Sequence, residues 1–263
     1  MVKRVMYLML ILLGVVTEAK PSIYVAKEMR PLYDRDLFLY ELLDLSLKAA
    51  DYPVDIQHVK VHPHQQRTLL ALSKGEVDLH WSMSSPAREK LAIAVKFPLF
   101  DGLIGKRALL VHRAQLARFE AVKDKAALAK LVAVQGHDWP DTKILAANGL
   151  KVRPIVNYQA MFDLILAQKA DYFPRSVIEV DSELAAQSAA DLVKLPGIYL
   201  SYPAHFYFFV NKQQPQLAEK LALGLSRLKE SGEYQRLLAR YFDLSFLSTA
   251  RPIYLDNPFF HTD

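Results

Sequence analysis

Apolar and polar positions along the chain change their period repeatedly, and each change predicts a new element. Residues 54–61 (VDIQHVKV) alternate with period two and predict a strand, and the apolar stretches 22–29 and 77–83 also read as strands. Between these strands, residues 36–50 and 65–74 carry apolar positions at helical spacing, and a glycine follows the second helix as a C-terminal cap. The resulting β-α-β-α-β order predicts a mostly parallel sheet with helices on its faces.

A second unit of the same kind follows a further strand predicted at residues 106–112. Its predicted elements are a helix at 124–130, strand 131–135, helix 140–148, strand 151–156, helix 158–169, strand 171–173 and helix 177–187. The remaining elements are strands at 198–202 and 205–211 and two amphipathic helices at about 215–230 and 233–242. Two successive α/β units predict two lobes rather than one long sheet.

The strands at 107–112 and 206–211 flank the second unit and are natural crossing segments between the lobes. We therefore predict an α/β, two-lobed architecture in which two crossing strands join the lobes and a ligand cleft lies between them. Residues 20–106 and 207–263 would form lobe 1, and residues 107–206 would form an inserted lobe 2.

The first nineteen residues have the pattern of a signal peptide. Lys3 and Arg4 precede an apolar run over residues 5–16, and Thr17-Glu18-Ala19 provides small residues at the first and third positions before a cleavage site after Ala19. The run is shorter than the roughly 20 residues that span a bilayer. We expect a secreted, periplasmic protein; an uncleaved N-terminal anchor is the alternative.

Composition narrows the function classes. The chain has 263 residues, 52% of them hydrophobic and 23% charged, so it has ample apolar material for a core, and its net charge of +5 is mild. No nucleic-acid-binding signature accompanies this charge, so we expect no nucleic-acid partner. The chain has no cysteine, which excludes disulfides, thiolate catalysis and a lipid-modified N-terminal Cys. We expect a free, soluble monomer.

Candidate binding residues follow the predicted strands, because ligands of open α/β sheets sit beyond the carboxyl ends of the strands. Ser84 and Ser85 open a helix whose N–H groups and hydroxyls favour an anion, and Arg88 offers a bidentate fork to a carboxylate. Arg175 stands before another helix that Ser176 is placed to cap. Tyr33, Trp81 and Trp139 are candidates for the apolar walls of the site. Ser82 and His137 are further candidates near these strand ends.

Other constellations give weaker signals. His62 and His64 stand two residues apart, but no third ligand follows at a recognised spacing, so we expect no metal and no cofactor. His137 beside Asp138 is the best acid/base candidate, but a turn-capping role is the favoured explanation of the pair. We find no nucleophile elbow and no H-E-x-x-H pattern, and we expect no enzyme.

Four stretches of this chain resemble the extracellular solute-binding proteins of family 3, the amino-acid-binding-like group with the type II periplasmic binding fold. The stretches are ALSKGEVD (71–78), SMSSPAR (82–88), FPLF (97–100) and KESGEY (229–234) with Tyr241-Phe242. The resemblance implies that Arg88 holds a ligand carboxylate, that Ser84 and Ser85 add polar contacts, and that Trp81 and Ser82 bring the backbone near the ligand. It also implies ligand contacts from residues 136–139.

Two departures from the family pattern concern charge. Ala87 stands where an acid usually precedes the arginine, and Arg175 lies in a loop where amino-acid binders often place an Asp for the ligand ammonium. We therefore expect a small organic anion, an amino acid or a related carboxylate, delivered to the permease of an ABC transporter. Two alternatives stay open: a sensory protein for a membrane receptor, or a dehydratase on the same fold with His137 or Glu179 as its acid.

Overall fold

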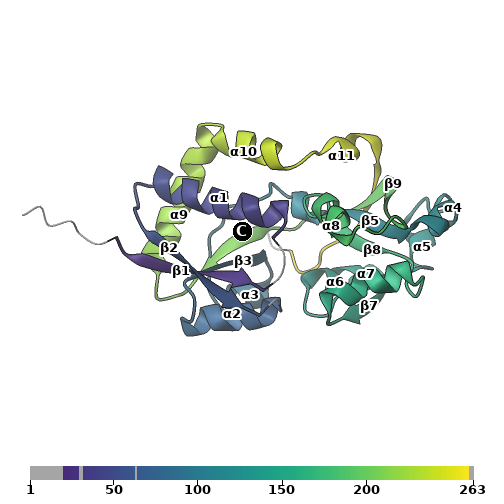
Figure 1. The fold of residues 1–263 in the computed structure, drawn as a ribbon, viewed down its shortest axis with the longest axis horizontal. Coiled ribbons are helices and arrows are strands. Elements are labelled where there is room, and N and C mark those ends of the chain that lie inside the picture. Colours follow the sequence, from purple (N-terminus) through teal and green to yellow (C-terminus); the bar gives the residue numbers. More distant parts are fainter. Residues whose placement is uncertain (1–19, 30–31, 63, 261–263) are drawn as a thin grey trace, which may run out of the picture.

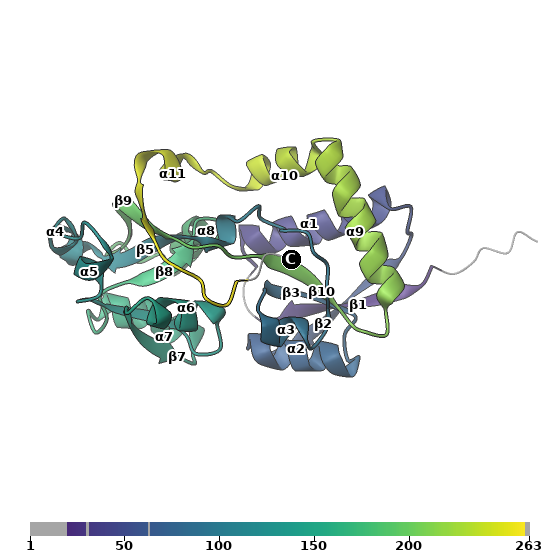
Figure 2. The same cartoon turned by 180° about the vertical axis from the view of Figure 1, so that it is seen from behind.

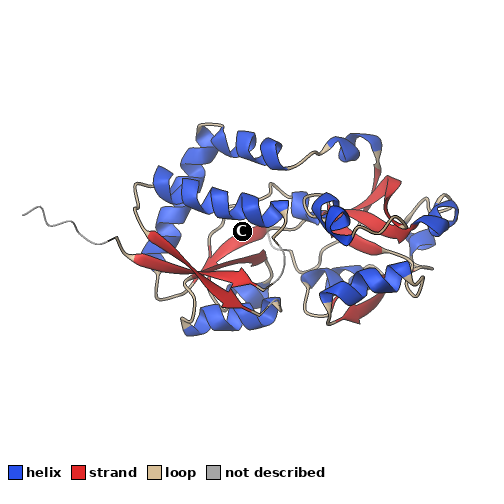
Figure 3. Ribbon diagram, in the orientation of Figure 1, coloured by secondary structure: helices blue, strands red, loops and turns tan. Residues whose placement is uncertain are grey.

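The computed structural model describes residues 20–29, 32–62 and 64–260, so the predicted signal peptide at 1–19 lies outside the described residues. The chain forms two lobes side by side, each built from strands covered by helices (Figure 1). Figure 3 separates the helices from the strands in the same view. Among the described helices, none is long and apolar enough to cross a membrane.

The first lobe contains one five-stranded sheet. Its strands are, in spatial order, β2 (Asp55–Val61), β1 (Ser22–Glu28), β3 (Leu79–Met83), β10 (Phe206–Val210) and β4 (Ile93–Ala94). β1 runs parallel to β2 and β3, whereas β10 runs antiparallel to β3 and β4. The carboxyl ends of the three parallel strands therefore meet at one edge, which faces the second lobe.

Five helices belong to this lobe: α1 (Asp34–Ala49), α2 (Gln65–Lys74), α3 (Pro86–Glu89), α9 (Pro215–Glu230) and α10 (Glu233–Tyr241). The helix α9 packs closely against α1, and Gly224 makes that approach possible. A Cβ at position 224 would lie 1.8 Å from the carbonyl oxygen of Ser46, so no larger residue fits without moving a helix.

The second lobe has a four-stranded sheet, β11 (Arg251–Tyr254), β9 (Leu192–Ser201), β5 (Lys106–His112) and β8 (Phe173–Ser176), and a parallel pair, β6 (Val132–Gly136) and β7 (Lys151–Ile155). A bridge between Ala133 and Tyr172 joins the pair to the start of β8. The helices of this lobe are α4 (Leu116–Phe119), α5 (Lys125–Leu128), α6 (Pro140–Ala147), α7 (Tyr158–Leu166), α8 (Val180–Gln187) and α11 (Ser245–Thr249).

The two predicted connections between the lobes are present, and each lies just before the strand that the sequence indicated. β5 belongs wholly to the second sheet and β10 to the first, so the chain crosses through the short 3₁₀ turn Leu103–Gly105 and through residues 202–205. The crossings touch: Tyr202 donates its N–H to the carbonyl of Gly105 at 3.2 Å, and a Cβ at position 105 would lie 2.0 Å from the Tyr202 oxygen.

The C-terminal part of the chain makes a third connection. After α10 the chain reaches α11, and β11 then adds to the second sheet parallel to β9 (Figure 2). The predicted division placed all of residues 207–263 in lobe 1, whereas residues 251–254 pair with the sheet of lobe 2. An edge strand of four residues that includes Pro252 has too little periodicity to reveal its partner in the sequence.

Candidate functional site

The larger of two cavities between the lobes has a volume of about 780 Å³. Lobe 1 contributes the residues after β1, the first turn of α1 and the segment before α2, and lobe 2 contributes the loop after β6, the start of α7, β8 and α8. Its lining side chains include Glu28, Tyr33, Arg35, Asp138, Trp139, Tyr158, Arg175 and Glu183. Both lobes thus bring strand ends to one cavity, as open α/β sheets do at their ligand sites.

A smaller cavity of about 400 Å³ lies beside the loop that follows β6. Asp138 and Trp139 of this loop line both cavities. The other side chains around the smaller cavity include Gln66, Ser84, Ser85, Arg88, His137, Lys143, Asn257 and Phe259. We call this space the Arg88 cavity.

Arg88 is 4% exposed, and all of its hydrogen-bond partners are neutral. Nη1 donates to Ser82 Oγ at 2.6 Å and to the Met83 carbonyl at 3.1 Å, and Nη2 donates to the Asp138 carbonyl at 3.0 Å. No carboxylate of the described chain forms an ion pair with this guanidinium. Burial lowers the Arg88 pKa to about 10, although the nearby charges of Asp138 and Asp141 partly oppose that shift. A buried cation with neutral partners is a favourable site for an anion.

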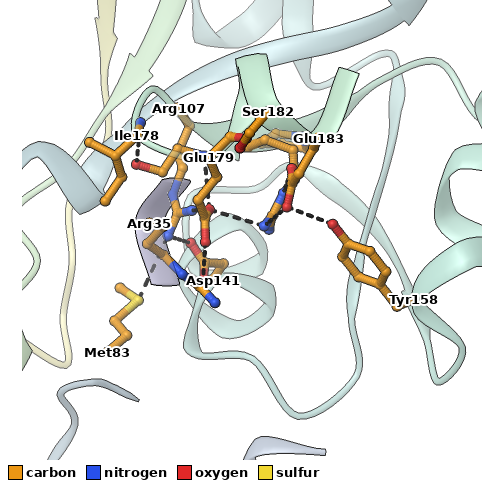
Figure 4. Close-up of polar contacts among 12 residues, drawn as sticks. Arg35, Met83, Arg107, Asp141, Tyr158, Ile178, Glu179, Ser182 and Glu183 are labelled. Carbon is orange, nitrogen blue, oxygen red and sulfur yellow. Dashed lines mark hydrogen bonds and ion pairs between the residues drawn. The ribbon is translucent and has the colours of Figure 1, made fainter. Parts of the chain in front are cut away.

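Glu179 lies at the centre of a second group of charges (Figure 4). Its Oε1 accepts from Arg35 Nη1 at 2.5 Å, and its Oε2 lies 3.3 Å from Arg107 Nη1 and 3.1 Å from Arg175 Nη2. Burial raises the pKa of Glu179, but the fields of Arg175, Arg35 and Arg107 outweigh it and hold the pKa at about 2. The Arg35–Glu179 contact joins lobe 1 to lobe 2.

Arg107 and its partners form a buried network of hydrogen bonds next to the crossings. Its Nη2 lies 2.6 Å from Asp141 Oδ1, and its Nε donates to the Tyr202 hydroxyl at 2.9 Å. That hydroxyl in turn donates to Asp141. Burial raises the Tyr202 pKa well above its usual value, so this phenol stays protonated and keeps its donor role.

Arg175 already has two carboxylate partners within its own lobe. Glu183 accepts from the Arg175 Nε at 2.7 Å and from its Nη2 at 2.5 Å. Glu179 Oε2 lies 3.1 Å from the same Nη2. The guanidinium also lies 4.8 Å from the Trp139 ring, and the Tyr158 hydroxyl donates to Glu183 at 2.6 Å. The lobe therefore neutralises Arg175, whereas it leaves Arg88 without an anionic partner.

The structure brings together most of the residues that the sequence selected. Ser84, Ser85, Arg88, His137 and Trp139 line the Arg88 cavity, and Tyr33, Trp139 and Arg175 line the larger cavity.

Three selected residues lie elsewhere. Trp81 is in the core of lobe 1, with its ring 4.9 Å from Tyr40, and Ser176 is buried in β8 and donates to the Leu103 carbonyl at 3.0 Å. Ser82 is buried too, and it contacts the site only through Arg88.

Sequence reasoning missed several lining residues. Tyr158 follows the end of β7, so the rule that selected the other loops would also have found it. Arg35 and Glu183 stand inside helices, where charged residues ordinarily face solvent, and no sequence signal distinguishes them. Gln66 N–H donates to Asp138 Oδ2 at 3.1 Å and so adds another contact between the lobes.

The rings of His62, His64 and His137 lie near one another among the residues that the structure describes. The rings of His62 and His64 lie 4.3 Å apart, and His137 of lobe 2 lies 5.4 Å from His64. In the part of the chain that the structure describes, no group of three or more His, Cys, Asp or Glu side chains is placed to hold a metal ion.

Comparison with known proteins identifies the fold. No protein-family model and no curated protein sequence matches the chain. Solved structures match well. An amino acid ABC transporter substrate-binding protein from Streptococcus pneumoniae bound to L-arginine has 16% identity and a TM-score of 0.61, covering 84% of this chain and 93% of that one.

Two further structures point to different roles on the same fold. The GluR0 ligand-binding core from Nostoc punctiforme with L-glutamate has 15% identity and a TM-score of 0.62, covering 84% of this chain and 99% of that one. An ancestral amino acid-binding protein, described as a precursor of cyclohexadienyl dehydratase, has 16% identity and a TM-score of 0.61, covering 84% and 95%. The chain thus has the two-lobed type II periplasmic binding fold, as the sequence predicted.

Proposed function

We propose that this protein is a solute-binding protein that encloses a small organic carboxylate between its lobes and delivers it to a membrane transporter. Arg88 carries the proposal, because it is a buried guanidinium without a carboxylate partner at the meeting point of the two lobes. The likeness to an ABC transporter substrate-binding protein supports the same role. The charges of Arg35, Arg107 and Arg175 are already neutralised by the protein itself.

The proposed ligand carboxylate would bind the two Arg88 N–H donors that have no partner among the described residues. Arg88 has five donors, and three of them contact Ser82, Met83 and Asp138. A charge-assisted hydrogen bond contributes about 1.5–3 kcal/mol, so a two-pronged contact is enough to decide the orientation of a small ligand.

Asp138 gives the site a partner for an ammonium group. Asp138 lines both cavities, its Oδ2 accepts from the Gln66 N–H at 3.1 Å, and its carbonyl oxygen accepts from Arg88. A ligand with a carboxylate next to an amine would therefore meet opposite charges a short distance apart. This arrangement favours an amino acid or a closely related carboxylate.

Export is part of the proposal. Residues 1–19 have the signal-peptide pattern, and cleavage after Ala19 would release a soluble periplasmic protein. N-terminal sequencing of the exported protein tests this point. A mature chain that still begins at Met1 would refute it.

The receptor role is the second candidate, and the likeness to the GluR0 ligand-binding core favours it. The same cleft would serve a receptor or a transporter, so the partner decides between them. Pull-down of the ligand-loaded protein with the permease or the receptor encoded beside it distinguishes the two.

The ionised state of Glu179 argues against the dehydratase alternative. Glu179, one of the two acids considered for it, has a pKa of about 2 and therefore holds no proton to donate at neutral pH. His137 is the remaining acid, and its Nδ1 lies 3.9 Å from Asp138. We propose that the protein binds its ligand without converting it.

Titration calorimetry of mature protein with L-amino acids and simple carboxylates tests the proposal. We expect at least one ligand to bind, Arg88→Gln to weaken that binding at least 30-fold, and Arg88→Lys to weaken it less. Arg113→Gln is the matched control, because Arg113 is exposed and its guanidinium donates to the Ala190 carbonyl and to no carboxylate among the described residues. Absence of carboxylate binding, or unchanged affinity in Arg88→Gln with an intact fold, would refute the proposal.

A further inference from the structure

The chain after β11 is fixed to lobe 2 before it reaches the cleft. Leu255 is buried, and its N–H donates to the Ser201 carbonyl at 2.9 Å. The Asn148 side chain, at the end of α6, donates to the Asp256 carbonyl at 2.7 Å and accepts from the Asp256 N–H at 3.0 Å. These paired contacts set the direction in which the chain leaves the lobe.

The next four residues are then held against the crossing between the lobes. Asn257 Nδ2 donates to the Pro203 carbonyl at 2.8 Å, and Asn257 Oδ1 accepts from the Phe259 N–H at 3.0 Å. The Phe260 ring lies 4.7 Å from the ring of His205. In Figure 2 the yellow end of the chain runs from β11 across to the space between the lobes.

This course places two C-terminal side chains in the wall of the Arg88 cavity. Asn257 and Phe259 line it together with Ser84, Ser85 and Arg88. Phe259 keeps 39% of its surface exposed, which is a large apolar surface for a residue beside a buried cation. Phe260 instead lines the neighbouring cavity near Lys90 and His205, which Asn257 and Phe259 also line.

We propose that the C-terminal segment 256–260 is part of the ligand site, and that Phe259 selects carboxylates with an apolar or aromatic group next to the carboxylate. This inference rests on the proposed function, since it assumes that Arg88 holds the carboxylate. A group attached close to that carboxylate would cover the exposed Phe259 ring and remove apolar surface from water. The volume of about 400 Å³ is large enough for a small aromatic acid.

Calorimetry with acetate and benzoate separates the contribution of Arg88 to binding from that of Phe259, because both anions offer a carboxylate and only benzoate carries a ring. We expect Phe259→Ala to weaken benzoate binding about five- to twenty-fold and to change acetate binding less than twofold. Phe260→Ala is the matched control, and we expect it to change both affinities less than twofold. Arg88→Gln should weaken both anions, and thermal melting confirms that each variant is folded.

The outcomes distinguish the two proposals. If Arg88→Gln abolishes benzoate binding while Phe259→Ala binds benzoate as tightly as the parent, the role of the C-terminal segment is refuted and the proposed function stands. If Phe260→Ala weakens benzoate as much as Phe259→Ala, docking of the segment and not contact of Phe259 is responsible, and the assignment to Phe259 fails. If the parent binds no carboxylate at all, the proposed function fails together with this inference.

Discussion

Replacing Glu179 with glutamine tests the buried charge group most directly. The substitution keeps the size of the side chain, but it turns one acceptor oxygen into an NH2 donor and removes the negative charge that Arg35, Arg107 and Arg175 share. The native pKa of about 2, against an ordinary value of 4.5, corresponds to about 3 kcal/mol of stability at neutral pH. Breaking a buried ion pair by removing one partner costs about 3–5 kcal/mol, which agrees with this magnitude.

The pH dependence of this loss has a definite sign. The pKa of Glu179 is lower in the folded than in the unfolded chain, so its contribution is complete above about pH 4.5 and is lost as pH falls toward 2. The difference in unfolding free energy between the parent and Glu179→Gln should therefore shrink from about 3 kcal/mol at pH 7 to about 1 kcal/mol at pH 3.

Urea unfolding of both proteins at pH 7 and pH 3 measures these differences, and thermal melting at pH 7 should show a loss of about 6–12 °C. The control is Glu120→Gln, which changes an exposed glutamate and should alter stability by less than about 0.5 kcal/mol. A Glu179→Gln protein that loses less than about 1 kcal/mol at pH 7, or equal amounts at both pH values, would show that the arginines do not depend on this carboxylate.

Three further predictions concern packing, lobe closure and ionisation. Gly224→Ala should lower the melting temperature by several degrees, because its Cβ would collide with the Ser46 carbonyl; an unchanged melting curve would contradict this packing. Arg35→Gln removes an ion pair between the lobes and should increase the radius of gyration of the ligand-free protein in small-angle scattering, whereas the exposed control Arg67→Gln should not. Burial and Glu183 raise the pKa of Tyr158 well above its usual value, so ultraviolet titration of parent and Tyr158→Phe should give the same phenolate signal up to pH 11.

Local signals in the sequence were sufficient to find most elements. The helix predicted at 65–74 has those bounds as α2, and Gly75 adopts φ of +79°, because helical periodicity and the cap act within a few residues of each other. β11 could not be found in this way, since only its pairing with β9, more than forty residues away in the chain, makes it a strand.

In the candidate site, too, local signals located positions in the sequence but did not reveal contacts that form only in the folded protein. The strand-end rule located Arg88, but it could not distinguish Arg88 from Arg175, because the difference lies in their partners and not in their positions. Glu183 reaches Arg175 only once α8 packs beside β8. Trp81 was misplaced for a related reason: every residue of β3 is buried, so alternation does not tell which face of the strand meets the cleft.

The position of Phe260 has a practical consequence for work with this protein. An affinity tag or a reporter fused after Asp263 would begin three residues beyond the ring that packs against His205, beside the wall of the Arg88 cavity. A fusion on the N-terminal side of β1 would extend from the far end of lobe 1 instead (Figure 1). Tags for binding measurements therefore belong on the N-terminal side of β1, and a dye attached after Phe260 would report on changes beside the Arg88 cavity.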